Sequence, residues 1–219
     1  MQPCFKPVAD HSLLVEVSTE ISEEANHTVL ALDKAIIEAR IDGLQEVVPA
    51  LVNLLVIFDP LTTDHAQVEA RIRALLPIKS AGQSASRHHV LDVCYDSELA
   101  PDLAAVAKAS GLSTEAVISA HCAAQYRVGM YGFAPGYAYL AGVPEAIQVP
   151  RKTAPVRDIP AGRVMIAGPQ CLCTTLIMPT GWSIIGATSA KIITGDPEQP
   201  FLFKVGDSVS FNRIRRESL

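Results

Sequence analysis

The sequence lacks the features that mark membrane, secreted and nucleic-acid-binding proteins. No apolar run among its 219 residues reaches the roughly 20 residues that a membrane helix needs. The first residues, MQPCFKPVADHSLLVEV, show no charged segment followed by an apolar segment and a cleavage site. The formal net charge of −5 disfavours nucleic acids and anionic membranes as partners. We therefore expect a cytoplasmic protein.

Cysteine is scarce, and the usual motifs of catalysis are missing. The five cysteines are irregularly spaced, and Cys171 and Cys173 lie too close together for a good disulfide or zinc site. No H-E-x-x-H or C-x-x-C motif occurs, so we predict reduced, buried thiols and no bound metal. The G-x-S-x-G and P-loop motifs are absent as well. If the protein handles ATP, it does so without a P-loop.

What the sequence does contain indicates an ordered core in one large or two small domains. Hydrophobic residues make up 49% and charged residues 19%, which excludes disorder. The first 96 residues show a β-α-β-β-α-β order, the split βαβ pattern of a ferredoxin-like α+β domain. Ser22 is the expected N-cap of its first helix. The expected elements are a strand at 11–18, a helix at 21–41, two strands within 44–60, a helix at 64–78 and a strand at 88–96.

The second part of the chain, residues 97–219, has the texture of an all-β domain entered through two short helices. These helices lie within residues 100–126 and are broken at Gly111. Residues 129–182 then hold seven Gly and seven Pro, half of the total of 28. Short apolar runs between turn signals predict a β-barrel or sandwich. The runs are RVMIAG, TTLIM, WSIIGAT, AKIIT, PFLFKV and SVSFN.

One aromatic segment stands out, YGFAPGYAYLAGVP at residues 131–144. Gly and Pro interrupt every period, so we read it as neither helix nor strand, and it is too apolar for an ordinary loop. Five aromatic residues fall within residues 126–139, more than one strand needs for packing. We expect the rings to form the wall of a cleft or to contact a partner.

Several polar residues beside this segment each have two interpretations. His121 either caps an apolar helix or takes part in catalysis. The adjacent cations Arg151 and Lys152 are either solvated or hold a carboxylate or phosphate. Gln170 is either structural or faces a cleft, and Trp182 is either core or pocket wall.

These motifs together resemble the allophanate hydrolase subunit 1 family, which includes the B subunit of 5-oxoprolinase and the kinase inhibitor KipI. The resemblance runs from about residue 8 to residue 214. It is carried by a histidine followed by an aromatic segment, a PR motif, a PAG turn and several later runs. The stretches are YRVGMYGFAPGYAYLAGVPE, VPRK, IPAGRVMIAGPQ, MPTGWSIIGAT and DPEQPFLFKVGDSVSF, with DHSLLVEV and GLQEVVPALVNLLVIFDP before them.

The resemblance implies an N-terminal α+β domain, here 1–96, and a C-terminal cyclophilin-like β-barrel, here 97–219. It implies a subunit of a heteromeric, ATP-dependent amide or lactam hydrolase. The expected partner is a homologous protein like allophanate hydrolase subunit 2 or the C subunit of 5-oxoprolinase. In the 5-oxoprolinase system a third subunit joins them to open the lactam, with ATP as co-substrate. The alternative is a KipI-like protein that binds and inhibits a histidine kinase.

The family motifs also indicate site residues. Arg151 of the PR motif, with Lys152, would hold an anionic group of the substrate. His121 and Gln170, which match the family's histidine and glutamine, would orient or polarise the carbonyl as catalytic residues. Substrate-binding residues of the aromatic loop and its neighbours would exclude water. They are Phe133, Pro135, Gly136, Tyr139 and Trp182.

Three departures from the family pattern indicate an altered pocket. The usual GGQTGIYP segment reads GPQCLCTT here, which keeps Gly168 and Gln170 only. The second PR motif reads Pro155-Val156, so its arginine is absent unless Arg157 substitutes for it by a one-residue slip. Arg163 replaces a small residue after PAG. The substrate therefore need not be 5-oxoproline itself.

Overall fold

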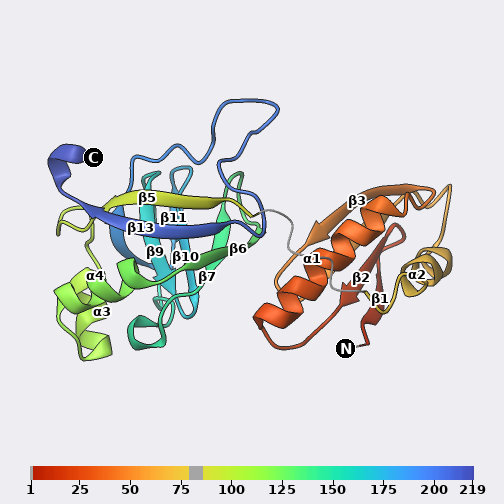
Figure 1. Cartoon of the computed structure of the whole chain (residues 1–219), viewed down its shortest axis with the longest axis horizontal. Helices are drawn as coiled ribbons and strands as arrows, with labels where there is room; N and C mark the ends of the chain where they lie inside the picture. Colours follow the sequence, from red (N-terminus) through yellow and green to blue (C-terminus); the bar gives the residue numbers. More distant parts are fainter. Residues whose placement is uncertain (1, 79–85) are drawn as a thin grey trace. The chain divides into compact units, whose positions relative to one another are not determined.

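The chain has the predicted α+β architecture, with a closed β-barrel in its second part (Figure 1). The computed structural model describes residues 2–78 and 86–219. It divides into two units, Met1–Ser84 and Ala85–Leu219. The predicted boundary between residues 96 and 97 therefore falls inside the second unit.

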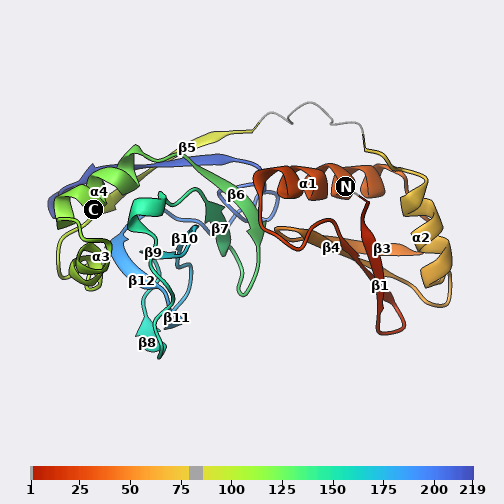
Figure 2. The ribbon, with the colours of Figure 1, turned by 90° about the horizontal axis from the view of Figure 1, so that it is seen from below.

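An antiparallel sheet with two helices on one face forms the first unit. Its elements are β1 (Cys4–Val8), β2 (Ser12–Glu16), α1 (Glu23–Glu38), β3 (Leu44–Pro49), β4 (Asn53–Phe58) and α2 (His65–Arg73). The sheet order is β1-β2-β4-β3. Alternate residues of β2 and β4 are fully buried against α1 and α2, as the pleat of a strand requires. Figure 2 shows α1 lying along the sheet.

The predicted start of α1 is confirmed in detail. The Ser22 side chain accepts a hydrogen bond from the backbone N–H of Ala25, and Glu23 and Glu24 occupy the first turn. Capping and the helix dipole both favour this arrangement. Helix α2 is shorter than predicted, because its last residue is Arg73 and Ala74 caps it.

In the second unit, seven strands close into a barrel in the order β10-β7-β6-β13-β5-β12-β9. A two-stranded sheet, β11-β8, stands apart from these seven. The elements are β5 (His88–Cys94), α3 (Leu103–Ser110), α4 (Thr114–Ala123), β6 (Tyr126–Tyr131), β7 (Ala138–Ala141), β8 (Val156–Ile159), β9 (Arg163–Ala167), β10 (Gln170–Cys173), β11 (Met178–Thr180), β12 (Ser183–Ala187) and β13 (Ser208–Ile214). Helices α3 and α4 end and begin as predicted, at Gly111 in the left-handed region and at the N-cap Ser113.

Alternation along the barrel strands creates two apolar clusters, one inside the barrel and one on its outer wall. On β9, Val164 and Ile166 belong to the interior cluster, while Met165 and Ala167 belong to the outer one. The outer cluster also contains Trp182, so the wall is apolar on both faces. An outer wall that carries apolar side chains needs covering groups. The connection between β6 and β7 supplies Ala134 and Tyr137, and the β11-β8 sheet supplies Ile159 and Met178.

The predicted membership of residues 88–96 in the N-terminal sheet is wrong. Strand β5 instead pairs in parallel with β13, from His88 beside Ser208 to Cys94 beside Ile214. This pairing buries Leu91 and Val93 inside the barrel. In the split βαβ pattern, residues 88–96 would pair with β2 at the edge of the sheet. Strand β1, which was not among the expected elements, pairs with β2 there instead.

Two further expectations about strands are corrected. The aromatic segment was expected to contain no strand, but its second half forms β7 between β6 and β10. The runs TTLIM, AKIIT and PFLFKV were expected as strands. Residues 174–177 and 190–205 instead connect strands, apart from one isolated bridge between Ile193 and Phe201.

Candidate functional site

The aromatic loop, residues 132–137, joins β6 to β7 at one end of the barrel. Backbone hydrogen bonds close it internally, from Gly132 N to Tyr137 O and from Tyr137 N to Ala134 O. Gly136 has φ +74, and a Cβ there would lie 3.1 Å from both Ile193 and Thr175. The backbone at this turn is therefore restricted to glycine. Phe133 has φ +70 and leaves 72% of its surface exposed.

Strand register aligns several of the predicted site residues on the outer wall of the barrel. Tyr139 of β7 is followed across the wall by Leu172, Met165 and Ile184. The next row toward the β9–β10 turn runs from Ala141 through Gln170 and Ala167 toward Trp182. The edge of the Tyr139 ring meets the Trp182 indole at 5.8 Å between ring centroids. Tyr139, Gln170 and Trp182 therefore belong to one face.

Arg151 completes this group. Its guanidinium carbon lies 5.5 Å from the centroid of the Trp182 ring, in the arrangement of a cation–π contact. Trp182 itself is 4% exposed and packs in the outer cluster. The core interpretation of Trp182 is therefore supported, while its role as a pocket wall stays a prediction. The exposed guanidinium of Arg151 rests on this packed indole. Within residues 2–78 and 86–219, Arg151 forms no ion pair.

Lys152, the other cation of the predicted pair, points to a different partner. Its Nζ lies 2.5 Å from Oδ2 of Asp102, which also accepts the backbone N–H of Ile184 at 2.7 Å. The backbone N–H of Lys152 donates to Gly181 O at 2.7 Å. These bonds hold residue 151 beside residues 181–182. Lys152 therefore positions Arg151, and its own charge is already neutralised.

We expect the Lys152–Asp102 pair to contribute a coupling energy of about 1 kcal/mol, because both side chains are only partly exposed. A double-mutant cycle of Lys152→Met and Asp102→Asn, followed by Trp182 fluorescence during urea unfolding, measures it. Asp102→Asn keeps an oxygen for the N–H of Ile184, so the cycle isolates the ion pair. A coupling energy of zero contradicts the positioning role.

His121 lies in the interior of the barrel, on the other side of the wall from Gln170. Its side chain has no exposed surface, and its ring stacks on Phe211 at 4.5 Å between centroids. Tyr95 Oη lies 2.8 Å from Nδ1, and Cys171 Sγ lies 3.7 Å from Nε2. An imidazole enclosed in this way reaches no substrate in this conformation, so its environment is that of a core histidine.

Burial also fixes the charge state of this interior group. It lowers the pKa of His121 to about 3, so the imidazole is neutral at pH 7. Burial raises the pKa of Tyr95 well above its usual value, so that its hydroxyl keeps its proton. The geometry suits a Tyr95 hydroxyl donating to Nδ1, with the proton of the neutral ring on Nε2.

Strand β10 forms from the middle of the GPQCLCTT segment, and the two cysteines that depart from the family pattern lie on this strand. Cys171 and Cys173 fill the barrel interior, and burial raises the pKa of Cys173 to about 12. Both are therefore packing residues and not nucleophiles. The prediction of buried thiols holds for them and for Cys94, whereas Cys4 is exposed.

The other two departures lie on β9 and β8. Arg163 Nη1 donates to Leu99 O at 3.3 Å, so this arginine binds a backbone carbonyl of the same unit. Val156 is exposed on β8. The PAG turn places Gly162 at φ +80, where a Cβ would lie 2.4 Å from Thr188 O.

Sequence reasoning missed two features that shape this region. Asp102 precedes a helix, a position at which an aspartate is read as a cap, but it makes no side-chain capping bond. Its role in holding Lys152 has no signal in the sequence. Phe133 was predicted from its motif, but its positive φ and exposure appear only in the structure.

Among residues 2–78 and 86–219, no group of three or more His, Cys, Asp or Glu residues could hold a metal ion. None of the helices described is long and apolar enough to cross a bilayer. A hollow of about 330 Å³ in the first unit is lined by Gln2, Pro3, Arg73, Leu76 and Pro77.

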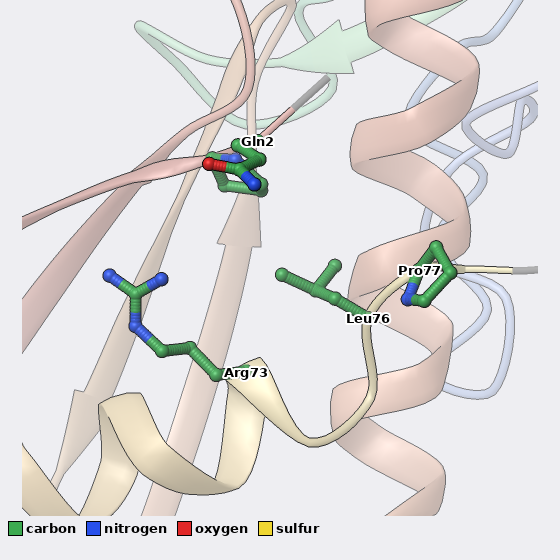
Figure 3. Close-up of a pocket in the computed structure, with 5 residues that line it drawn as sticks. Gln2, Arg73, Leu76 and Pro77 are labelled. Carbon is green, nitrogen blue, oxygen red and sulfur yellow. The ribbon is translucent and has the colours of Figure 1, made fainter.

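This hollow contains none of the predicted site residues. Figure 3 shows Arg73 on one side, with Leu76 and Pro77 on the other. The Arg73 guanidinium is already engaged, since it lies 2.7 Å from the Glu69 carboxylate and 4.3 Å from the centroid of the Phe5 ring. We assign no function to it.

Comparison with known proteins gives one consistent result. A family model described as the carboxyltransferase domain, subdomain C and D, matches residues 3–203. A Bacillus subtilis protein, by name the B subunit of 5-oxoprolinase, is 34% identical over 96% of this chain and 92% of its own length. An Escherichia coli O157:H7 protein of the same name is 29% identical over 93% of each chain.

Solved structures agree with this result. The protein TTHA0988 matches with a TM-score of 0.82 and 34% identity over 94% of this chain. This chain spans only 40% of the length of TTHA0988. A conserved uncharacterised Pyrococcus horikoshii protein, PH0987, is 36% identical over 98% of this chain and 99% of its own, with a TM-score of 0.58. The Kluyveromyces lactis urea amidolyase shares the fold, with a TM-score of 0.78 at 16% identity over 99% of this chain and 15% of its own.

Proposed function

The chain belongs to the carboxyltransferase-domain family that includes the B subunit of 5-oxoprolinase, and from that premise we propose that it is part of an ATP-dependent hydrolase. The enzyme would open a small cyclic or linear amide that carries an anionic group, such as 5-oxoproline. We propose that it works with a homologous partner subunit, and with a third subunit for the lactam. ATP would be the co-substrate of the complex, and this chain carries no P-loop motif.

The observation that carries this proposal is the exposed guanidinium of Arg151 resting on the packed indole of Trp182. A planar cation held by stacking keeps its N–H groups free for a bidentate contact with a carboxylate. Gln170 lies in the same row as Trp182, two strands away, so their backbones are about 10 Å apart. A small amide substrate bridges such a distance.

Each of three residues at the outer wall would then have a separate role in binding or hydrolysis. Arg151 would bind the anionic group, and the amide N–H of Gln170 would donate to the carbonyl oxygen of the substrate. Tyr139 would shield the reacting atoms from bulk water. One water adds to the carbonyl carbon and the C–N bond breaks, so that the nitrogen leaves as an amine. A second water is consumed as ATP becomes ADP and phosphate.

The aromatic loop and two enclosed or paired residues would have supporting roles. His121 and Lys152 would not touch substrate, since the first is enclosed and the second is paired with Asp102. Pro135 and Gly136 would set the backbone of the loop, and Phe133 points to solvent. This division replaces the direct substrate contacts expected for these five residues from the family motifs.

We expect Arg151→Ala to raise the KM of the reconstituted complex for an anionic amide by about 10- to 100-fold, since a charged hydrogen bond is lost. The assay is ATP-dependent release of glutamate from 5-oxoproline. Arg151→Lys keeps the charge but not the planar stacking, so it should rescue only part of the loss.

Lys108→Ala, on the exposed face of α3, is the matched control and should leave KM unchanged. Unchanged KM and kcat in Arg151→Ala would remove the outer wall as the substrate site.

A further inference from the structure

Large apolar side chains are exposed together at the barrel end that carries the aromatic loop. Three connections contribute them, the aromatic loop, residues 174–177 and residues 188–207, which include the blue loop at the top of Figure 1. We name this surface the Phe133 rim. Its members are Phe133 at 72% exposure, Ile177 at 72%, Leu176 at 41% and Ile193 at 38%.

Specific contacts join these connections, so the rim is one surface. Thr175 Oγ1 donates to Pro135 O at 2.7 Å, which ties residues 174–177 to the aromatic loop. At Gly136 a Cβ would lie 3.1 Å from Ile193 Cγ1 and 3.5 Å from Phe201. Tyr131 Oη donates to Phe203 O at 2.8 Å and fixes the base of the third connection.

The conformation of Phe133 indicates that its exposure has a use. A φ of +70 is unfavourable for a residue with a Cβ, and an exposed phenyl ring gains no burial in return. Glycine would suit this backbone better and would expose no apolar surface. A strained residue that presents a ring to solvent is typical of a contact that forms on binding.

The comparisons suggest which molecule covers the rim. TTHA0988, 34% identical to this chain, carries the equivalent segment in 40% of its length, so that a further 60% belongs to the same polypeptide. The relatives that match over nearly their whole length are named as one subunit of an enzyme. In such proteins the remaining part must be a separate chain.

Negative charge beside the rim indicates which side chains the partner would carry. The turn at residues 194–199 lies beside Ile193 and carries the exposed carboxylates of Asp196 and Glu198. A matching partner would present apolar side chains to Phe133 and Ile177, and cations to this turn.

We propose that the Phe133 rim is the docking surface for the partner subunit, a polypeptide equivalent to the remaining part of TTHA0988. The inference rests on the proposed function for the existence of that subunit. Phe133 and Ile177 are the anchors of the interface, because they expose the most surface and come from different connections.

The test is co-expression of the full chain with a polypeptide that corresponds to the remaining 60% of TTHA0988, with affinity measured by calorimetry. Phe133→Asp and Ile177→Asp should each weaken binding by at least about 30-fold, the size of a hot-spot effect. Val90, an apolar residue on β5 that is 62% exposed, supplies the control. Val90→Asp should change the affinity less than about threefold, as expected for a site outside the interface. Near-UV circular dichroism and Trp182 fluorescence check that the variants are folded.

Phe133→Gly gives a second, opposite pair of readouts. It relieves the positive φ, so the melting temperature should rise or stay level while the affinity for the partner falls. A residue with only a structural role would show the reverse.

The remaining outcomes are equally decisive. Aspartate variants that bind as tightly as the parent chain overturn the proposal, as does a parent chain that binds no such subunit. A parent chain that self-associates through these residues makes a second copy the occupant instead. If the complex forms through the rim but hydrolyses no amide, the docking surface stands and the proposed function fails.

Discussion

Replacing His121 with alanine is expected to lower the free energy of unfolding of the barrel by about 4 kcal/mol. The substitution removes a ring that stacks on Phe211 and contacts Tyr126, and it opens a cavity between them. It also leaves the Tyr95 hydroxyl without its 2.8 Å partner in the interior. The only tryptophan of the chain, Trp182, lies in the barrel, so its fluorescence in urea reports this unit alone.

The same residue should make the barrel sensitive to acid. Burial lowers the pKa of His121 from 6.5 to about 3. Between these two pH values the unfolded state binds a proton at this residue and the folded state does not. Stability is therefore fully present above pH 6.5 and declines as the pH falls toward 3, by up to about 1.4 kcal/mol per pH unit. His121→Gln keeps an acceptor for Tyr95 but does not titrate, so the slope between about pH 6 and pH 4 should fall.

His27, exposed on α1 of the first unit, supplies a control for the removal of an imidazole outside the barrel. The effect of His27→Ala on barrel unfolding should stay below about 0.5 kcal/mol. A His121→Ala protein that keeps its stability but loses turnover would restore His121 as a catalytic residue.

Asp207→Ala is the second substitution with a large expected effect, a loss of about 4 kcal/mol. The carboxylate is buried and accepts the backbone N–H groups of Arg87 and Lys204, at 2.9 Å and 2.8 Å. His89 Nε2 lies 2.9 Å from the same side chain. Alanine would leave these groups without a partner, at the point where β5 and β13 begin.

Acid should also weaken the hydrogen bonds of the Asp207 carboxylate, but at a lower pH than it affects His121. Burial alone would raise the pKa of Asp207, but the hydrogen bonds from Lys204, His89 and Arg87 together hold it below 3.8. Its contribution is therefore present above pH 3.8 and is lost as the pH falls through the lowered pKa. Asp207→Asn keeps one oxygen acceptor and should cost less than Asp207→Ala.

Asp196→Ala, in an exposed turn of the same connection, serves as the control and should be nearly neutral. Urea unfolding followed by Trp182 fluorescence measures all three variants. An Asp207→Ala protein as stable as the parent would show that neighbouring waters satisfy both N–H groups.

Local signals in the sequence were sufficient for most elements. The N-cap Ser22, the helix break at Gly111 and the two strands joined near Pro49 all follow from rules that act within a few residues. The existence of a strand at β5 was predicted as well. Its partner was not, since β13 lies 120 residues further along the chain. Pairing over that distance depends on the whole barrel and leaves no local pattern.

At the candidate site, too, some features could be predicted from the sequence and others could not. The motif around Arg151 and Trp182 could be read from the sequence, and the structure brings the two together. The sequence could not separate Lys152 from Arg151, because adjacent residues in a loop reach different partners once the chain is folded. His121 was ambiguous because an apolar helix end is equally consistent with a core ring and with a catalytic one.

The parallel pairing of β5 with β13 sets an order of events during synthesis. Every hydrogen-bonded pair of the N-terminal sheet forms among residues 4–58, so that sheet can fold as soon as these residues and the helices have emerged. The barrel must wait, because β13 fills the gap between β5 and β6 and is translated last. Until then, β5 and β6 present open edges, which makes this interval the one in which a nascent chain depends most on chaperones.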